Sequence, residues 1–267
     1  MPTASPIYDV VVVGAGISGL IATQLLDRAG LNIKCFEACS RVGGRAVSVQ
    51  QSDLFLDLGA TWFWLNEPLV QQLVNNLGLG TFPQAIEGDA LFETLVDAPS
   101  RLRGNPIDAA SGRFQAGASS LALGLAAQLK PGVLELGDPV HSLSEEDGEI
   151  VVKSSKQIVR AKHVIIAVPP ALAAELIGFT LDLPADVRKA AHPQHIAVMN
   201  WAKEKYTLPT QAASAGGFGH ELFQQPLGHG RIHWASTEVA TEFGGHLEGA
   251  VRAGIQAALQ TGFNLKS

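Results

Sequence analysis

Three glycines near the start of the chain have the spacing of a phosphate-binding loop. Gly14, Gly16 and Gly19 follow four valines at residues 10–13, and apolar residues at helical spacing come after them. The motif therefore lies between an expected buried strand and an expected helix. Gly14 permits a tight turn, Gly16 the approach of a pyrophosphate, and Gly19 close packing of helix on strand. With Ser18 in the first helical turn, the motif predicts a bound phosphate at the helix start.

An acidic residue ends the next expected strand. Residues 33–36 are suited to a strand, and Glu37 follows them. A carboxylate at this point of such a fold accepts hydrogen bonds from both ribose hydroxyls of a dinucleotide. Together these residues predict dinucleotide binding, against the alternative of a glycine-rich turn with a surface glutamate. They do not separate NAD from FAD.

The composition is that of a globular protein. The chain has 267 residues, of which 46% are hydrophobic and 16% charged. Its net charge of −6 and its lack of a basic run do not favour a nucleic-acid partner. It contains no apolar run long enough to cross a bilayer and no signal-like start, so we expect a cytoplasmic protein without a membrane partner.

Cysteines and histidines do not form a recognisable metal motif. Cys35 and Cys39 lack CxxC spacing, and Cys35 lies in the expected second strand, which favours a buried thiol. The histidines form two close pairs in sequence, His192 with His195 and His229 with His233. Neither pair has a Cys or Glu at a metal-ligand spacing, so no metal site is predicted.

The residues from Glu37 onward distinguish between the two dinucleotides. The stretch EACSRVGGRA, residues 37–46, resembles the flavin amine oxidase family, in which Glu-Ala is followed by Arg-x-Gly-Gly-Arg. The matching residues are Glu37, Ala38, Arg41, Gly43, Gly44 and Arg45. A glycine pair lets the chain run beside a second stretch of cofactor, and Arg45 offers a donor fork to phosphate or flavin. The resemblance implies FAD.

Further segments follow in the family's order. LDLGATWFW, residues 56–64, resembles the segment that passes near the flavin ring, and its candidate contacts are Gly59, Ala60 and Thr61. FQAGASSLALGLAAQL, residues 114–129, resembles a glycine-then-helix segment. LGDPVHSL and AKHVIIAVPPAL resemble the later part of the cofactor domain, where Val140 matches a residue whose backbone contacts adenine.

The most specific match is at residues 230–258, GRIHWASTEVATEFGGHLEGAVRAGIQAA, which resembles the family's C-terminal flavin-binding signature. The matching residues are Ala235, Thr237, Glu238, Ala240, Gly245, Glu248, Gly249, Ala250, Val251 and Gly254. The resemblance implies that Glu238 reaches the ribityl–phosphate region. It also implies that the helix starting near His246 and Leu247 aims its positive end at the flavin pyrimidine. The apolar residues of that helix equally suit a simple core.

The resemblance implies an α/β fold with a Rossmann-like FAD-binding domain and a reduced second, substrate-type domain. We expect the FAD-binding domain to be discontinuous and to comprise residues 1–80, 115–185 and 229–267. Residues 81–114 and 186–228 would then form the remnant of the substrate domain.

The middle of the chain departs from the family pattern. The sequence passes within a few residues from the segment 179–191 to MNWAKEKYTLPTQ, so the lysine that holds a water at flavin N5 in the family cannot be assigned to any residue. Lys203 and Lys205 belong to the later segment and are expected on a solvated face. The family's two substrate-flanking aromatic rings are also altered, because one position holds His246 and no ring matches the other near residues 207–209.

His246 and Trp62 are the candidate catalytic residues. His246 could stack on substrate or act as a base, because imidazole exchanges protons near neutral pH, or it could simply begin the helix. Trp62, with Phe63 and Trp64, could line an apolar substrate site, although such a cluster also suits a core. Residues 217–223 could form a lid or a loop.

The resemblance implies an FAD-dependent oxidoreductase, a flavoprotein acting on a small-molecule amine or amino acid. The flavin would take a hydride from the carbon next to the substrate nitrogen, water would hydrolyse the imine, and dioxygen would reoxidise the flavin and give hydrogen peroxide. The C-terminal half contains no cysteine, so we expect non-covalent FAD.

Two alternatives stay open. The chain could bind FAD but lack a competent substrate site and serve as a binding or partner module. Its uncovered apolar surface would then pair with another subunit, for instance in a homo-oligomer. An NAD-dependent dehydrogenase is the third interpretation, which the Gly-Gly-Arg segment and the C-terminal signature disfavour.

Overall fold

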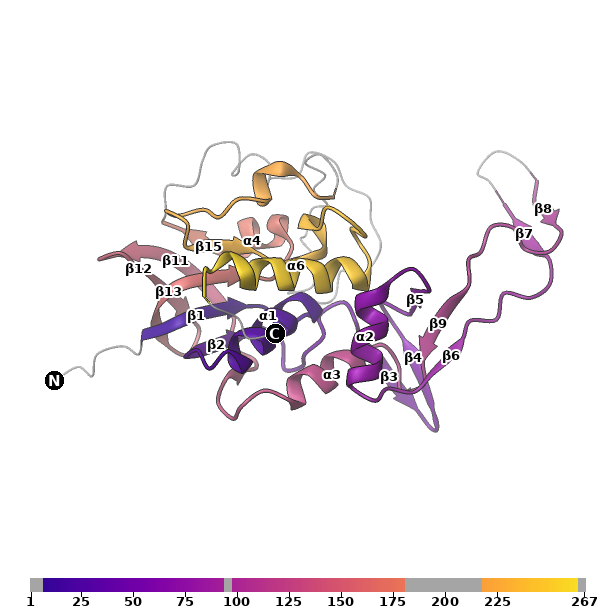
Figure 1. The fold of residues 1–267 in the computed structure, drawn as a ribbon, viewed down its shortest axis with the longest axis horizontal. Coiled ribbons are helices and arrows are strands. Elements are labelled where there is room, and N and C mark those ends of the chain that lie inside the picture. Colours follow the sequence, from indigo (N-terminus) through magenta and orange to yellow (C-terminus); the bar gives the residue numbers. More distant parts are fainter. Residues whose placement is uncertain (1–6, 94–97, 181–217, 264–267) are drawn as a thin grey trace.

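The structure is a computed structural model that describes residues 7–93, 98–180 and 218–263. An eight-stranded sheet forms its centre (Figure 1), in the order β10-β2-β1-β13-β12-β11-β14, with β15 also paired to β13. The strands are β1 (Ile7–Val13), β2 (Ile33–Phe36), β10 (Leu134–Glu135), β11 (Val140–Glu146), β12 (Glu149–Ser154), β13 (Ile158–Ile166), β14 (Gly178–Phe179) and β15 (Ile232–Trp234).

The sheet has a parallel part and an antiparallel part, and both use β13. Strands β10, β2, β1, β13 and β15 run parallel to their neighbours. On the side away from β1, the first half of β13 pairs antiparallel with β12, which pairs antiparallel with β11. In β1, Val10 and Val12 enter one buried cluster while Val11 and Val13 enter another. The uniformly apolar run is therefore a strand covered on both faces, as predicted.

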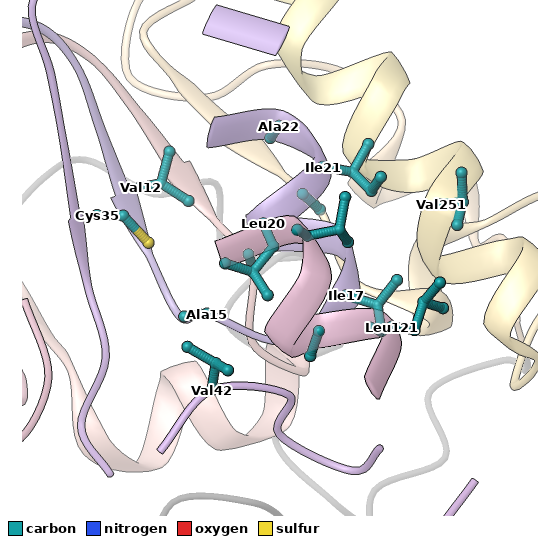
Figure 2. Packing of buried hydrophobic residues seen from close by; sticks show 14 of the residues in the cluster. Val12, Ala15, Ile17, Leu20, Ile21, Ala22, Cys35, Val42, Leu121 and Val251 are labelled. Atoms are coloured by element: carbon teal, nitrogen blue, oxygen red, sulfur yellow. The ribbon is translucent and has the colours of Figure 1, made fainter. Parts of the chain in front are cut away.

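Helices cover one face of the parallel part. They are α1 (Ile17–Arg28), α2 (Pro68–Asn76), α3 (Ser119–Ala127) and α6 (Leu247–Gln260). Figure 2 shows Ile17, Leu20 and Ile21 of α1 in one apolar cluster with Leu121 of α3 and Val251 of α6. The other face packs against α4 (Pro170–Leu176) and residues of the C-terminal segment. The α/β class with a Rossmann-like domain is confirmed.

Residues 48–114 form smaller sheets at one end of the molecule. β3 (Ser48–Gln51) pairs with β4 (Leu54–Asp57), β5 (Trp62–Trp64) and β6 (Thr81–Pro83) flank β9 (Ser111–Phe114), and β7 (Ala90–Phe92) pairs with β8 (Ser100–Leu102). The β7–β8 hairpin projects away from the body (Figure 1). Large apolar side chains are exposed here, including Leu54, Leu65 and Leu91.

Several sequence predictions are confirmed by these elements. The second strand spans Ile33–Phe36, and Gly30 after α1 has a φ of +80°, which suits its role in ending the helix. Cys35 is fully buried, and burial raises the pKa of its thiol to about 12. Other predictions lie outside the described residues, namely those for His192, His195, Lys203, Lys205 and residues 207–209.

Close contact between α1 and α6 depends on a glycine. A methyl group at Gly254 would overlap the carbonyl oxygen of Ser18 in α1. This contact draws the first and last long helices of the described chain together over the sheet (Figure 1).

We expect Gly254→Ala to lower the free energy of unfolding by about 1–3 kcal/mol, because the added carbon meets rigid backbone. Gly124 in α3 is the matched control, since a carbon there meets only the flexible end of Leu77, at 3.2 Å. Gly124→Ala should change stability by no more than about 1 kcal/mol, and alanine's helix propensity favours a gain. Urea unfolding would measure both, and equal losses would contradict the close-contact explanation.

A pair of histidines, one of them buried, joins β13 to β15. His163 Nδ1 lies 3.1 Å from His233 Nε2, and His233 is fully buried. Burial, helped by the neighbouring His163, lowers the pKa of His233 to about 4. The unfolded chain therefore takes up a proton at this imidazole at higher pH than the folded protein does.

Stability should consequently fall as the pH drops from about 6.5 toward 4, the interval between the unfolded and folded pKa values of His233. The loss attributable to His233 between pH 7 and 5 is about 2 kcal/mol. The variant His233→Gln should flatten this part of the profile in urea unfolding. The exposed His229 provides the control, and an unchanged slope in His233→Gln would contradict the assignment.

Candidate functional site

The glycine loop leaves the start of α1 open. Gly14 has a φ of +103° and donates its N–H to Phe36 O at 2.7 Å, which turns the chain from β1 toward the helix. Gly16 is the N-cap residue and supplies no side-chain cap, and the first turn, which includes the buried Ser18, contains no acid. A carbon added at Gly16 would meet nothing within 4 Å. The unpaired N–H groups and positive end of α1 thus face open space suited to a phosphate.

Glu37 is held at this loop by backbone hydrogen bonds. Its Oε2 accepts the N–H of Ala15 at 2.7 Å, and its Oε1 accepts the N–H of Cys39 at 2.8 Å. Each carboxylate oxygen retains acceptor capacity for a hydroxyl group. Asp138 donates its N–H to Glu37 O at 3.0 Å, which brings the start of β11, and so the buried Val140, to the same corner.

The Gly-Gly-Arg segment lies directly on the glycine loop. Gly43 donates its N–H to Ala15 O at 2.8 Å, and Gly16 and Gly43 form an isolated parallel bridge. Gly43 and Gly44 have φ values of +98° and +54°. The chain therefore passes close to the glycine loop, and Ala38 follows Glu37 in a half-buried position.

The guanidinium of Arg45 faces another protein side chain. Its Nη1 and Nη2 donate to the two carboxylate oxygens of Glu238 at 2.6 and 3.1 Å. Burial by itself would raise the pKa of Glu238, but the charge and hydrogen bonds of Arg45 outweigh burial and lower it. Two residues for which the sequence predicted separate cofactor contacts are thus paired across 193 positions.

Residues 59–61 lie beside Arg45. Ala60 donates its N–H to Arg45 O at 3.0 Å, and the Thr61 hydroxyl donates to Gly59 O at 2.9 Å. The predicted flavin-side segment therefore lies beside the Gly-Gly-Arg segment.

Helices α2 and α6 begin next to one another. Glu248, in the first turn of α6, accepts the N–H groups of Leu69 and Val70 at 3.0 Å each and so caps α2. Its other oxygen accepts from Arg252 Nε at 3.1 Å. Sequence reasoning assigned Glu248 only as part of a signature, because the helix it caps is 178 residues away.

Glu67, the N-cap residue of α2, points to the start of α6 instead of capping its own helix. Its Oε1 lies 2.7 Å from His246 Nδ1, and its Oε2 accepts the N–H of Trp64 at 3.0 Å. Glu67 is fully buried, whereas the His246 side chain is 39% exposed. Glu67 was not among the residues predicted from the sequence, although a glutamate directly before Pro68 does indicate a helix start.

The rings of Trp64 and Phe243 lie next to that of His246. The rings of Trp64 and His246 stack with centroids 4.6 Å apart, and Trp62 lies edge-on to Trp64 at 6.1 Å. The turn before α6 is fixed by Thr237, whose hydroxyl accepts the N–H of Gly245 at 2.8 Å and donates to His246 O at 3.1 Å. The predicted helix start is confirmed, with His246 as N-cap residue and Leu247 as the first helical residue. The two candidate catalytic residues, Trp62 and His246, are therefore linked through the ring of Trp64.

Phe218 is a further aromatic residue at this end, and the sequence analysis did not single it out. A carbon added at Gly244 would overlap its side chain, and its ring lies near Gly245. Gly219 donates its N–H to Glu238 O at 2.9 Å. The described part of residues 217–223 therefore packs on the turn that precedes α6.

Comparison with known proteins decides the family. A family model for the NAD(P)-binding Rossmann-like domain matches residues 12–77. The model for flavin containing amine oxidoreductases matches residues 99–195 and 183–260, which together exceed half of the chain. The chain belongs to this family.

Curated members of the flavin amine oxidoreductase group match over short stretches. A probable flavin-containing monoamine oxidase A from Dictyostelium discoideum is 38% identical over 89 residues, 33% of this chain and 20% of that protein. Putrescine oxidase from Kocuria rosea is 40% identical over 84 residues, 32% of this chain and 18% of that protein. Protoporphyrinogen oxidase 2 from Arabidopsis thaliana is 50% identical over 70 residues, 26% of this chain and 14% of that protein. The matches span a fifth or less of these relatives' lengths.

Solved structures share the fold. Wild-type putrescine oxidase bound to putrescine aligns with a TM-score of 0.74 at 17% identity, covering 95% of this chain and 98% of that chain. Cyclohexylamine oxidase from Brevibacterium oxydans aligns with a TM-score of 0.77 at 16% identity, covering 96% and 99%. Within the part of the chain that the structure describes, no helix is long and apolar enough to cross a membrane.

We expect Glu248→Ala to lower the free energy of unfolding by about 2–4 kcal/mol, because it leaves the N–H groups of Leu69 and Val70 without their acceptor and removes one of the two carboxylates that pair with Arg252. Amide exchange should also accelerate at the start of α2. Glu242 is the matched control, since it pairs with Arg252 as well but is 64% exposed. Glu242→Ala should change stability by less than about 0.5 kcal/mol, and a comparable loss would contradict the capping role of Glu248.

Proposed function

We propose that the chain binds FAD non-covalently and is an FAD-dependent oxidoreductase that acts on small-molecule amines or amino acids. One observation carries this proposal. The open start of α1 and the start of α6 are linked by a continuous series of contacts, which we call the site edge. These contacts are the Gly16–Gly43 bridge and the Arg45–Glu238 ion pair.

The residues along this edge suit the successive parts of FAD. The uncapped N–H groups after Gly16 suit the pyrophosphate, and the buried carboxylate of Glu37 suits the adenosine ribose, with Val140 beside it. Arg45 and Glu238 come next along the edge. The remaining candidates for cofactor contact are Gly14, Ser18, Gly19, Ala38, Gly43, Gly44, Gly59, Ala60, Thr61, His246 and Leu247.

The start of α6 suits the flavin end. His246 provides no side-chain cap, and the one acid in the first turn, Glu248, serves α2. The N–H groups of α6 therefore remain available for an anionic acceptor, and the helix dipole favours negative charge there. Gly254, which contacts α1, lies eight helical residues after His246, or about 12 Å, which leaves room for the ribityl chain.

When bound, the flavin would accept a hydride from the carbon next to the substrate nitrogen and pass the electrons to dioxygen, which gives hydrogen peroxide. The chain's share is to hold both partners and exclude water from the region between them. Trp62, Trp64 and His246 provide the ring surface at that end. The names of the relatives refer to monoamine, putrescine and protoporphyrinogen, so the match does not choose the substrate.

The other proposals from the sequence stay with this function. They are the discontinuous FAD-binding domain of residues 1–80, 115–185 and 229–267, the cytoplasmic location, and the absence of nucleic-acid and membrane partners. A second candidate function, an FAD-binding module without turnover, is favoured by the exposed apolar side chains of residues 48–114, which a partner or second copy would cover.

The visible spectrum of the purified protein, before and after anaerobic addition of amines and amino acids, tests the proposal. We expect a flavin spectrum that bleaches with at least one compound. A flavin spectrum that never bleaches would favour the binding module. A colourless protein that takes up no added FAD would contradict both, and stabilisation of that protein by NAD would favour a dehydrogenase.

We also expect Glu37→Gln to weaken FAD binding by about 10- to 100-fold, because it removes a charged acceptor of ribose hydroxyls. Glu135 at the end of the adjacent strand β10 is the matched control, since it pairs with Lys34 and Lys156. Fluorescence titration of the apoprotein would measure both dissociation constants. Equal affinities in Glu37→Gln and wild type would place the ribose elsewhere.

A further inference from the structure

The Glu67 carboxylate is fully buried beside a partly exposed imidazole. Its side-chain contacts among the described residues are the Trp64 N–H at Oε2 and His246 Nδ1 at Oε1. The neighbouring carboxylate of Glu248 is taken up by α2 and Arg252, so Glu67 is the acid that His246 contacts. No cation of the described chain is paired with Glu67.

This contact sets which nitrogen of His246 carries hydrogen. For an ionised Glu67 and a neutral imidazole, Nδ1 donates to Oε1, because a carboxylate only accepts hydrogen bonds, and Nε2 is left as an acceptor. The stacked Trp64 ring and the Thr237 bonds to the turn fix the orientation of the imidazole. The His246 side chain is 39% exposed, so an incoming group can reach the imidazole from solvent.

We propose that Glu67 is a positioning residue that holds His246 in its Nδ1–H tautomer, so that Nε2 takes the proton of the incoming substrate ammonium. This inference rests on the proposed function. In the step, an N–H bond of the ammonium breaks and an N–H bond forms at Nε2, with no change in oxidation state. The buried carboxylate balances the resulting imidazolium, and the exposed ring later releases the proton to water.

This proton transfer would explain why Glu67 and His246 lie at the start of α6. A neutral amine has the nitrogen lone pair that assists departure of hydride from the adjacent carbon, whereas an ammonium does not. A base at this end would therefore supply the reactive form of the substrate next to the flavin site. His246 would be the catalytic residue, and Glu67 would act only through it.

The variant Glu67→Gln separates positioning from simple packing. Glutamine has nearly the same shape, and its carbonyl can keep the Trp64 N–H bond. Its NH2 group then faces His246 Nδ1 as a donor, which should move the hydrogen of His246 to Nε2. Long-range ¹H–¹⁵N NMR of histidine-labelled protein at pH 8 reads the tautomer directly, with or without turnover.

We expect the Nδ1–H tautomer for His246 in wild type and the Nε2–H tautomer in Glu67→Gln. The exposed Glu242 provides the control, and Glu242→Gln should keep the wild-type tautomer. An Nε2–H tautomer in wild type would overturn the proposal without any variant. An unchanged Nδ1–H tautomer in Glu67→Gln would also overturn it.

The second measurement is the rate of anaerobic flavin reduction by an amine that bleaches the wild-type protein. Glu67→Gln should slow reduction about 100-fold, the scale of a lost general base, with FAD affinity within about twofold of wild type. A wild-type rate in a variant with the switched tautomer would overturn the proton-acceptor role. If no amine reduces wild-type protein, the proposed function and the acceptor role both fall, while the tautomers still decide the positioning role.

Discussion

Two buried carboxylates allow two helices to begin side by side, and the site depends on that arrangement. The starts of α2 and α6 both carry partial positive charge and unpaired N–H groups, which would repel at close range. Glu67 and Glu248 are both fully buried between them. Each reaches across to the other helix, since Glu248 caps α2 and Glu67 holds His246. Arg252 offsets part of the added negative charge.

Polar contacts between separate segments also hold the rest of the site together. Glu37 from β2 accepts an N–H of the glycine loop, Gly43 returns an N–H to that loop, and Arg45 pairs with Glu238 from the C-terminal segment. Each contact links segments that come from different parts of the chain. A molecule that contacts the starts of α1 and α6 therefore meets a surface already assembled by hydrogen bonds within the chain, which favours binding through preorganisation.

The parts that sequence predicts well are those written in local patterns. The four valines of β1, the glycine spacing and Glu37 specify a strand, a turn and an acid within about 30 residues, and the structure has each where expected. The start of α6 is also local, since His246 precedes an apolar helical pattern.

The partners of individual side chains could not be predicted in this way. Arg45 and Glu238 are 193 residues apart, and Glu67 and His246 are 179 apart. Their residue types suit solvent, ligand or each other equally, and only the tertiary fold chooses. The exposure of Leu54 and Leu91 could not be predicted from the sequence either. Apolar side chains favour burial, and strands this short show too little alternation of polar and apolar residues to indicate which face is exposed.

The packing of α6 on α1 has a consequence for how the protein is made. The ribosome delivers α1 early, but the helix that covers its apolar face comes more than 200 residues later. At bacterial or eukaryotic elongation rates this delay is about 10–50 s. During that interval the part of α1 that α6 contacts, including Ile21 and the backbone at Ser18, lacks its partner helix, so the nascent chain presents an apolar surface that chaperones can bind. The Rossmann-like sheet thus reaches its final packing only after α6 has been synthesised.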